Sequence, residues 1–208
     1  AYNSDTDNLY MKSKVLAEQA VYEFLETSDL PVLIALPGWM IGPWDAGPTA
    51  AGQLVINFVT GKIPVIPHGY MMVVDVRDVA EAMITMIDHG KSGDRYVVSG
   101  RYTPAADLLT ALERVTQVPG PTRQLPFPVM LGVAWFTENV SRITGNTPLI
   151  TRRSLRVMRN RGPHSCALAE RELGVSFRPI DATLRDTVMW LQQYDFLDSE
   201  SVVLPQPV

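Results

Sequence analysis

Residues 9–25 read LYMKSKVLAEQAVYEFL, and the interpretation of the whole chain starts from this stretch. It holds no glycine or proline and is rich in alanine, leucine and glutamate, so we expect a helix. Tyr10 and Lys14 are four residues apart, and a helix places such side chains on one face, one turn apart. The same helix can carry an apolar stripe, made of Leu9, Leu16, Ala20 and Phe24.

A tyrosine one turn from a lysine has a chemical use. A free phenol has a pKa of about 10, so it exchanges protons poorly at neutral pH. A nearby ammonium favours the phenolate and makes the phenol a better general acid or base. Such a pair suits the reduction of a carbonyl or the oxidation of an alcohol. The alternative is an ordinary surface pair, which is common at this spacing.

Composition limits the class of protein. The chain has 208 residues, of which 46% are hydrophobic and 19% charged, as expected of a folded globular domain. Its net charge of −4 gives no overall basic balance, so we expect no nucleic-acid partner. Cys166 is the single cysteine, and the three histidines are far apart, so we predict no disulfide and no metal site. A single cysteine also fits a cytoplasmic protein.

The longest apolar run covers residues 125–136 and is too short to cross a bilayer, so we predict no membrane span. We interpret it as a helix of the core or of a pocket wall. Contact with a membrane surface is the alternative.

Short apolar runs and helical segments alternate over the first hundred residues, which predicts an α/β fold with a parallel sheet. The second half is mostly helical, which predicts a separate lobe over the ligand edge of the sheet. We expect Asp78, Thr103 and Asp181 to cap helices. The predicted strands are 30–36, 71–76 and 95–98, and the predicted helices begin near residues 53, 79, 104, 129, 147, 165 and 181.

The first predicted strand ends in PGWMIGP, residues 37–43. Proline and glycine at this density predict a shaped loop. In an open α/β sheet, loops at the carboxyl ends of strands carry the ligand site. An ordinary strand-to-helix connection is the alternative.

Taken together, these motifs resemble the extended branch of the short-chain dehydrogenase/reductase superfamily, the NAD-dependent epimerase/dehydratase family. The dihydroflavonol-4-reductase-like group is the most similar in pattern. The matching stretches follow one another in the family's order: KSKVLAE at 12–18, LPGWMIGP at 36–43 with Pro48 and Thr49, VDVRDVA at 74–80, GDRY at 93–96, AERELG at 169–174 and LRDT at 184–187.

The resemblance implies the C-terminal part of a Rossmann-type doubly wound parallel sheet with a smaller, mainly helical substrate lobe. Residues 1–100 would form the C-terminal half of the NAD(P)-binding domain, with about 44–70 contributing to the lobe, and 101–208 would form the lobe itself. The implied cofactor is NAD or NADP, with NADP preferred. The implied catalytic residues are Tyr10 and Lys14, the implied cofactor contacts are Tyr10, Lys14, Pro37, Gly38, Trp39 and Met40, and the implied substrate contacts are Thr49, Arg77 and Arg156.

The chain also departs from the family pattern. The family's glycine-rich phosphate loop and its catalytic serine or threonine lie upstream of the tyrosine, and neither is visible here. The chain begins at Ala1 and reaches Tyr10 almost at once, so we expect residues upstream of it. We predict that this polypeptide alone binds NADPH weakly or not at all.

Two other functions stay open. Arginines cluster between residues 152 and 161, and Arg156 or Arg159 could bind the diphosphate of a nucleotide sugar, as in the family's epimerases and dehydratases. A solvated helix face is the plainer interpretation of this cluster. A non-catalytic dinucleotide-binding protein is the other alternative. Family members often pair through the tyrosine-bearing helix, which implies a possible homodimer acting on a small-molecule substrate.

Overall fold

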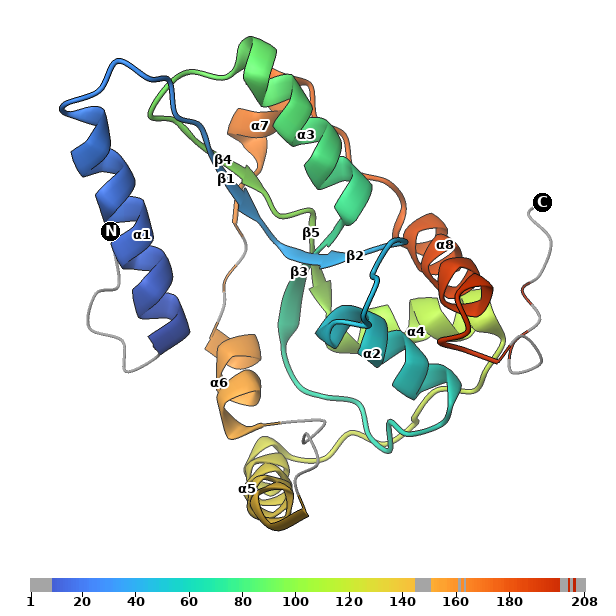
Figure 1. The fold of residues 1–208 in the computed structure, drawn as a ribbon. Coiled ribbons are helices and arrows are strands. Elements are labelled where there is room, and N and C mark those ends of the chain that lie inside the picture. The colour runs from blue at the N-terminus through green and yellow to red at the C-terminus, as the bar shows by residue number, and fades with distance from the viewer. Residues whose placement is uncertain are drawn as a thin grey trace.

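The structure is a computed structural model that describes residues 9–144, 151–160, 162, 164–198, 202 and 204. Two small sheets cross at the centre of the described chain, and helices surround them (Figure 1). The strands are β1 (Ile34–Pro37), β2 (Trp39–Ile41), β3 (Tyr70–Asp75), β4 (Arg95–Val98) and β5 (Arg101–Pro104). The helices are α1 (Leu9–Leu25), α2 (Ala50–Val59), α3 (Val76–His89), α4 (Ala105–Thr116), α5 (Phe127–Thr144), α6 (Arg152–Asn160), α7 (Ala167–Leu173) and α8 (Ile180–Gln193).

Two segments of the chain, residues 34–41 and 95–104, each contribute one strand to both sheets. β1 pairs in parallel with β4, β2 pairs in parallel with β3, and β3 pairs antiparallel with β5. One residue, Gly38, separates β1 from β2, and two residues separate β4 from β5. Each run therefore passes from one sheet into the other, and the parallel pairs confirm the predicted α/β class.

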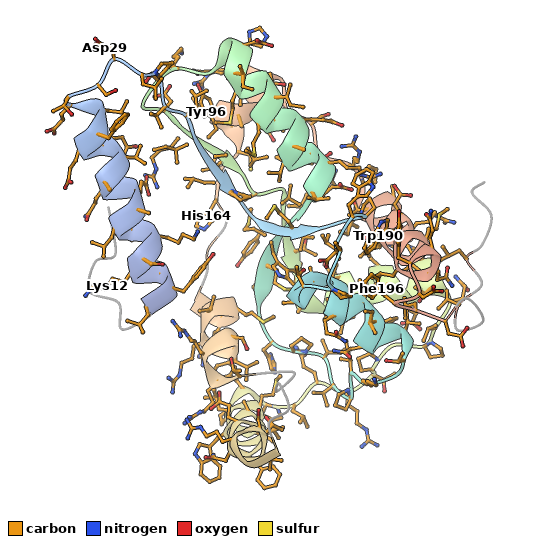
Figure 2. All side chains as sticks on the ribbon, viewed as in Figure 1. Lys12, Asp29, Tyr96, His164, Trp190 and Phe196 are labelled. Carbon is orange, nitrogen blue, oxygen red and sulfur yellow. The ribbon has the colours of Figure 1, made fainter. Side chains whose placement is uncertain are left out.

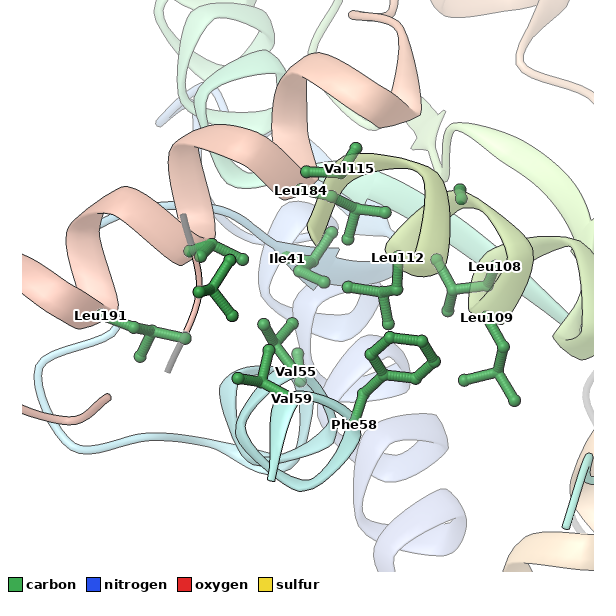
Figure 3. Packing of buried hydrophobic residues seen from close by; sticks show 14 of the residues in the cluster. Ile41, Val55, Phe58, Val59, Leu108, Leu109, Leu112, Val115, Leu184 and Leu191 are labelled. Atoms are coloured by element: carbon green, nitrogen blue, oxygen red, sulfur yellow. The ribbon is translucent and has the colours of Figure 1, made fainter. Parts of the chain in front are cut away.

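The larger core lies between β2 and three helices, α2, α4 and α8 (Figure 3). Leucine, valine and phenylalanine side chains from these helices interlock there, because each helix presents residues spaced three and four apart to the others. The fully or almost fully buried members include Val55, Phe58, Leu108, Leu112, Leu184, Val188 and Leu191.

A second core lies where α3 and α7 pack on the β1–β4 pair, around Tyr96 and Val98. A third, much smaller cluster holds α5 to α6 through Met130, Ala134 and Leu155. In Figure 1, α5 is the lowest element of the view, and α6 stands just above it.

Three predicted helix caps are wrong. Asp75, not Asp78, caps α3: β3 runs into the helix without a loop, and the Asp75 carboxylate accepts the backbone N–H of Arg77 at 2.8 Å. Asp78 lies inside the first turn. Pro104 and Pro179, not Thr103 and Asp181, hold the cap positions of α4 and α8.

Two strands, β2 and β5, were not predicted. Residues 39–41 looked like part of a loop, and residues 101–104 looked like a helix start. The predicted start of α6 at Thr147 and Pro148 falls outside the described residues.

Candidate functional site

The predicted catalytic pair lies on α1. The helix brings Lys14 over the ring of Tyr10, with 5.6 Å between the lysine Nζ and the ring centroid. Tyr10 is 66% exposed and Lys14 is exposed as well, so a small molecule can reach both polar groups. The predicted geometry of the pair, one turn apart on one face, is present.

The second half of α1 attaches the helix to the rest of the chain. Glu18 forms an ion pair with Arg95, which begins β4, at 2.5 Å between Oε1 and Nε. The Tyr22 hydroxyl donates to the carbonyl oxygen of Gly93 at 3.4 Å. No residue of α1 is fully buried, and the helix stands at the edge of the molecule (Figure 1). Figure 2 labels Lys12 near the start of this helix, two residues after Tyr10.

The predicted cofactor loop, residues 37–40, lies where the chain changes sheets. A Cβ on Gly38 would lie 2.4 Å from the carbonyl oxygen of Ser99 and 2.5 Å from that of Met72. The Gly38 N–H donates to the carbonyl oxygen of Val98 at 3.2 Å. Only glycine allows this approach of three backbone segments, so this position has a structural reason that the sequence did not reveal.

The side chains beside Gly38 divide between core and surface. Trp39 packs against the larger core, whereas Pro37 and Met40 are exposed. The loop therefore presents apolar surface next to a rigid backbone crossing. A flat, weakly polar ring could lie against such a surface.

Thr49 precedes α2, but its hydroxyl does not cap that helix. It donates to the Asp45 carboxylate at 2.9 Å, and the Thr49 N–H donates to the same carboxylate at 2.8 and 3.0 Å. Asp45 therefore fixes the loop that leads from β2 to α2. The role of Asp45 was not predicted from the sequence, because its contacts with Thr49 are seen only in the folded loop.

Arg77 lies in the first turn of α3, and two carboxylates hold its guanidinium. It donates to Asp75 at 2.7 and 3.0 Å and to Asp186 of α8 at 2.6 Å. Burial would raise the pKa of the Asp75 carboxyl. Hydrogen bonds from Arg77 and from the Thr183 hydroxyl outweigh burial and hold this pKa below its usual value. The hydrogen bond to Asp75 in turn raises the pKa of Arg77.

A neighbouring ionic group binds the same helix to the chain just before α8. Arg178 forms ion pairs with the buried Asp78 and with Glu81, the latter at 2.6 Å. The backbone N–H of Arg178 also donates to Asp78 at 2.8 Å. These contacts show that the carboxylates and arginines around residues 75–81 connect α3 to α8 and to the chain before it, and so stabilise the fold.

The arginine cluster lies on α6, against α5. Arg152 forms an ion pair with Glu138 at 2.8 Å, and the Arg159 guanidinium lies 4.5 Å from the centroid of the Phe127 ring. Arg156 lies between them in sequence and is exposed. The predicted site residues thus lie on α1, at the β1–β2 junction, before α2, on α3 and on α6. Among these residues, the structure shows a side-chain contact between Tyr10 and Lys14.

The model of the NAD dependent epimerase/dehydratase family matches residues 2–99. A protein of Synechocystis sp. named "Putative dihydroflavonol 4-reductase" is 27% identical over 207 residues, which cover 96% of this chain and 60% of that protein. Sterol demethylase protein B of Methylococcus capsulatus is 28% identical over 187 residues, which cover 88% of this chain and 56% of that protein.

Solved structures agree with these relatives. The crystal structure of gox2253 superposes with a TM-score of 0.73 at 30% identity, covering 89% of this chain and 56% of that one. RMD of Pseudomonas aeruginosa, solved with NADPH, has a TM-score of 0.59 at 22% identity, covering 89% and 56%. The enzyme WbmF of Bordetella bronchiseptica, solved with NAD+, has a TM-score of 0.66 at 21% identity, covering 97% and 57%.

This chain therefore spans somewhat more than half the length of the proteins it matches. The agreement holds in sequence and in fold, and the Rossmann-type α/β fold class predicted from the motifs is confirmed. The predicted resemblance of the chain to the extended, dihydroflavonol-reductase-like short-chain dehydrogenase/reductases, with residues 2–99 matching the NAD dependent epimerase/dehydratase family model, is confirmed.

Proposed function

We propose that the protein is an NAD(P)H-dependent oxidoreductase that reduces a ketone or an aldehyde. Tyr10 gives its proton to the substrate oxygen, and Lys14 stabilises the phenolate that remains. The observation that supports this best is the placement of the Lys14 ammonium 5.6 Å from the Tyr10 ring centroid, on an exposed face within the family-matching segment.

The nicotinamide cofactor, when bound, supplies the hydride. The exposed Tyr10 hydroxyl and Lys14 ammonium suit the hydroxyls of its ribose. The exposed Met40 and Pro37 suit the face of its ring. No glycine-rich turn of the G-x-x-G-x-x-G kind occurs in these 208 residues, so the residues present fit the nicotinamide end of the cofactor only. We prefer NADP to NAD.

For the substrate, we propose a site between the segment of residues 44–70 and the helical lobe of residues 101–208, with Thr49 and Arg156 as contacts. Arg77 is different, because Asp75 and Asp186 already hold its guanidinium. We assign Arg77 a structural role at the joint between α3 and α8.

A nucleotide-sugar epimerase or dehydratase is the second candidate. The exposed Arg156 on a basic helix favours it, since arginine binds diphosphates in a forked geometry. Such an enzyme returns the hydride to its substrate, so it causes no net loss of reduced cofactor. Sugar-nucleotide binding that is lost in Arg156→Ala would support this candidate, and unchanged binding would reject it.

The test uses the full-length gene product with NADPH and a panel of ketones and aldehydes, followed by nicotinamide absorbance. The reductase predicts one NADPH oxidised for each carbonyl reduced. Lys14→Met should lower kcat/KM by roughly a hundredfold or more, because it removes the ammonium that stabilises the phenolate. Lys12→Met, an exposed lysine two residues away, is the control and should leave kcat/KM unchanged.

We also propose a homodimer that pairs through α1. The stripe predicted on this helix is present, and Leu9, Leu16 and Phe24 are all exposed. Light scattering should give a dimer mass that falls to a monomer in the double variant Leu16→Ser, Phe24→Ser. A monomeric parent protein at micromolar concentration would contradict this proposal.

A further inference from the structure

A pocket lined by aromatic side chains lies at the C-terminal end of α8, and the proposed reaction does not use it. Its volume is about 320 Å³, at the lower end of the range for small-molecule sites. The walls are the side chains of Trp44, Ala46, Trp190, Tyr194 and Phe196. Exposed tryptophan and tyrosine also gather at the ends of membrane-spanning helices, but among the described residues no helix has the length and apolarity to cross a membrane. We call this site the α8 aromatic pocket.

The α8 aromatic pocket is separate from the Tyr10–Lys14 pair. Figure 2 labels Trp190 and Phe196 close together on one side of the molecule, whereas Lys12, near the start of α1, is labelled on the opposite side. The loop after β2 and the end of α8 supply the wall residues. The proposed substrate contacts, Thr49 and Arg156, are not among them.

The end of α8 forms one wall. The backbone N–H of Phe196 donates to the carbonyl oxygen of Leu191 at 2.9 Å, so the chain turns back on the helix. The ring centroid of Trp190 lies 5.6 Å from that of Phe196 and 4.9 Å from that of Tyr194. Trp190 is buried, whereas Tyr194 is 54% exposed. Tyr194 therefore keeps aromatic surface that a ligand can cover.

Trp44 forms a second wall with a strained backbone. Its φ is +69°, in the left-handed region that bulky residues rarely adopt. The Ala46 N–H donates to the Trp44 carbonyl oxygen at 2.9 Å, and the bond between Thr49 and Asp45 fixes the same loop. The Trp44 side chain is 67% exposed, so burial in the core does not compensate for the strain. Such strain is typical of ligand sites.

A buried hydrogen-bond donor lies at the same pocket. The indole Nε1 of Trp190 is buried, and none of the described residues accepts its hydrogen. Folded proteins seldom leave a buried N–H without an acceptor, so an exception needs a reason. Two unfavourable features, at Trp44 and at Trp190, therefore meet at one pocket, as expected of a site kept for binding.

The charge around the pocket indicates the class of ligand. The two stretches of sequence that supply its walls, residues 15–61 and 186–208, contain no lysine, arginine or histidine. Asp45 and Asp195 each lie between two wall residues in the sequence. The C-terminal end of a helix adds partial negative charge. These features favour a positively charged ligand.

The aromatic walls favour an organic cation, because the face of an aromatic ring is negative and attracts ammonium groups. The described residues contain no group of three or more histidine, cysteine or carboxylate side chains that could hold a metal ion. Aromatic and alanine walls offer few acceptors for the N–H groups of a primary amine, so a methylated nitrogen suits them better. We propose that the α8 aromatic pocket binds a small quaternary ammonium compound, with its cationic head against Trp44 and Tyr194. This proposal does not depend on the proposed reductase activity.

The test is a titration of the full-length gene product with choline at constant ionic strength, followed by tryptophan fluorescence. Trp44 and Trp190 line the pocket, so a bound cation should change their emission. We expect a dissociation constant in the millimolar range or below. The alcohol 3,3-dimethylbutan-1-ol has the shape of choline without its charge, and it should bind at least about tenfold more weakly. Equal affinity for the two compounds, or no response to either at about 50 mM, would overturn the proposal.

Two leucine variants test the aromatic faces. Trp44→Leu and Tyr194→Leu keep apolar bulk in the walls but remove a ring, so each should weaken choline binding about tenfold and barely change binding of the uncharged alcohol. Trp135→Leu removes an exposed tryptophan from α5 and is the matched control, which should leave both affinities unchanged. Choline binding at the parental affinity in both pocket variants would contradict the proposal.

Asp195→Asn tests the contribution of charge. Asp195 has a left-handed backbone with φ of +60°, which asparagine adopts readily, so the variant should fold normally. Choline affinity should fall roughly two- to fivefold, because an exposed carboxylate contributes modestly, and an unchanged affinity would contradict the charge argument. Circular dichroism melting checks the fold of each variant. The comparison of choline with the alcohol in the parent protein needs no variant, so it decides the proposal even if a variant melts early.

Discussion

Gly38 illustrates how much one residue can decide. At this position the run from β1 to β2 passes under the carbonyl oxygens of Ser99 and Met72, and a Cβ would lie within 2.5 Å of both. Gly100 lies on the other run, with φ of +69° and an even closer approach to Val73. The candidate cofactor loop is therefore held by backbone packing rather than by side chains.

Gly38→Ala should lower the free energy of unfolding by about 2 kcal/mol, because backbone atoms of two neighbouring strands must move. For a domain of this size, that loss lowers Tm by roughly 4–8 °C. Gly47→Ala is the control, since a Cβ there meets no atom within 4 Å. Equal melting of the two variants, measured by circular dichroism, would show that the crossing tolerates a side chain.

Two arginine–aspartate pairs should contribute differently to the free energy of unfolding, because one is buried and the other is exposed. Arg178 pairs with Asp78, whose side chain is 1% exposed, so Arg178→Ala leaves a buried carboxylate without its cation. We expect a loss of roughly 3 kcal/mol. Arg114 and Asp181 are both well exposed, and Arg114→Ala should cost less than about 1 kcal/mol. Urea unfolding of both variants checks the ranking, and a larger loss in Arg114→Ala would refute it.

At the scale of elements, the joint between α3 and α8 connects the two larger cores. Asp75 caps α3, accepts from Arg77 and from the Thr183 hydroxyl, and lies beside Asp186 through their shared arginine. The pKa of Asp75 is lowered in the folded state. Its stabilising contribution is therefore complete above the ordinary pKa of an aspartate, about 4, and is lost as pH falls through the lower folded value.

Asp75→Asn should destabilise the protein at pH 7, because Arg77 loses a charged partner. The same variant should lose less stability than the parent protein between about pH 7 and pH 3, because one of the titrating groups is gone. Urea unfolding at both pH values measures this difference. Asp29→Asn, at an exposed loop aspartate, is the control, and a parallel pH profile in Asp75→Asn and the parent protein would contradict the account.

Much of the element order could be predicted from sequence. The strand predicted at 95–98 matches β4, and the helix starting at 129 is within two residues of α5. The cap of α3 was predicted wrongly because Asp75 and Asp78 are both suitable caps by local pattern. The choice between them depends on where β3 ends. The strands β2 and β5 were not predicted because both pair with β3, which lies more than 25 residues away from each of them in sequence.

The candidate site was predictable in part for the same reason. Tyr10 and Lys14 meet within one helix, so their spacing is a local property of the sequence. The bracing of Arg77 by Asp186 joins α3 to α8, and no local pattern reveals it. A resemblance can assign such a residue to a substrate, whereas only the folded contacts show that two carboxylates already hold it.

At the scale of the whole molecule, these 208 residues contain the proposed catalytic pair, Tyr10 and Lys14, but no glycine-rich phosphate turn. Such turns bind pyrophosphate through backbone N–H groups at a helix start. The 208-residue polypeptide should therefore bind NADPH weakly or not at all in a calorimetric titration. A dissociation constant in the low micromolar range or below would contradict this prediction.

The most direct test of the central claim is the turnover of NADPH by Tyr10→Phe in the full-length gene product. Phenylalanine keeps the ring near Lys14 but cannot donate a proton, so kcat should fall by about 10²–10⁴ while cofactor affinity changes little. Tyr22→Phe on the same helix is the control, and it should keep its activity. Carbonyl reduction at the parental rate in Tyr10→Phe would contradict the assignment of Tyr10 as the proton donor.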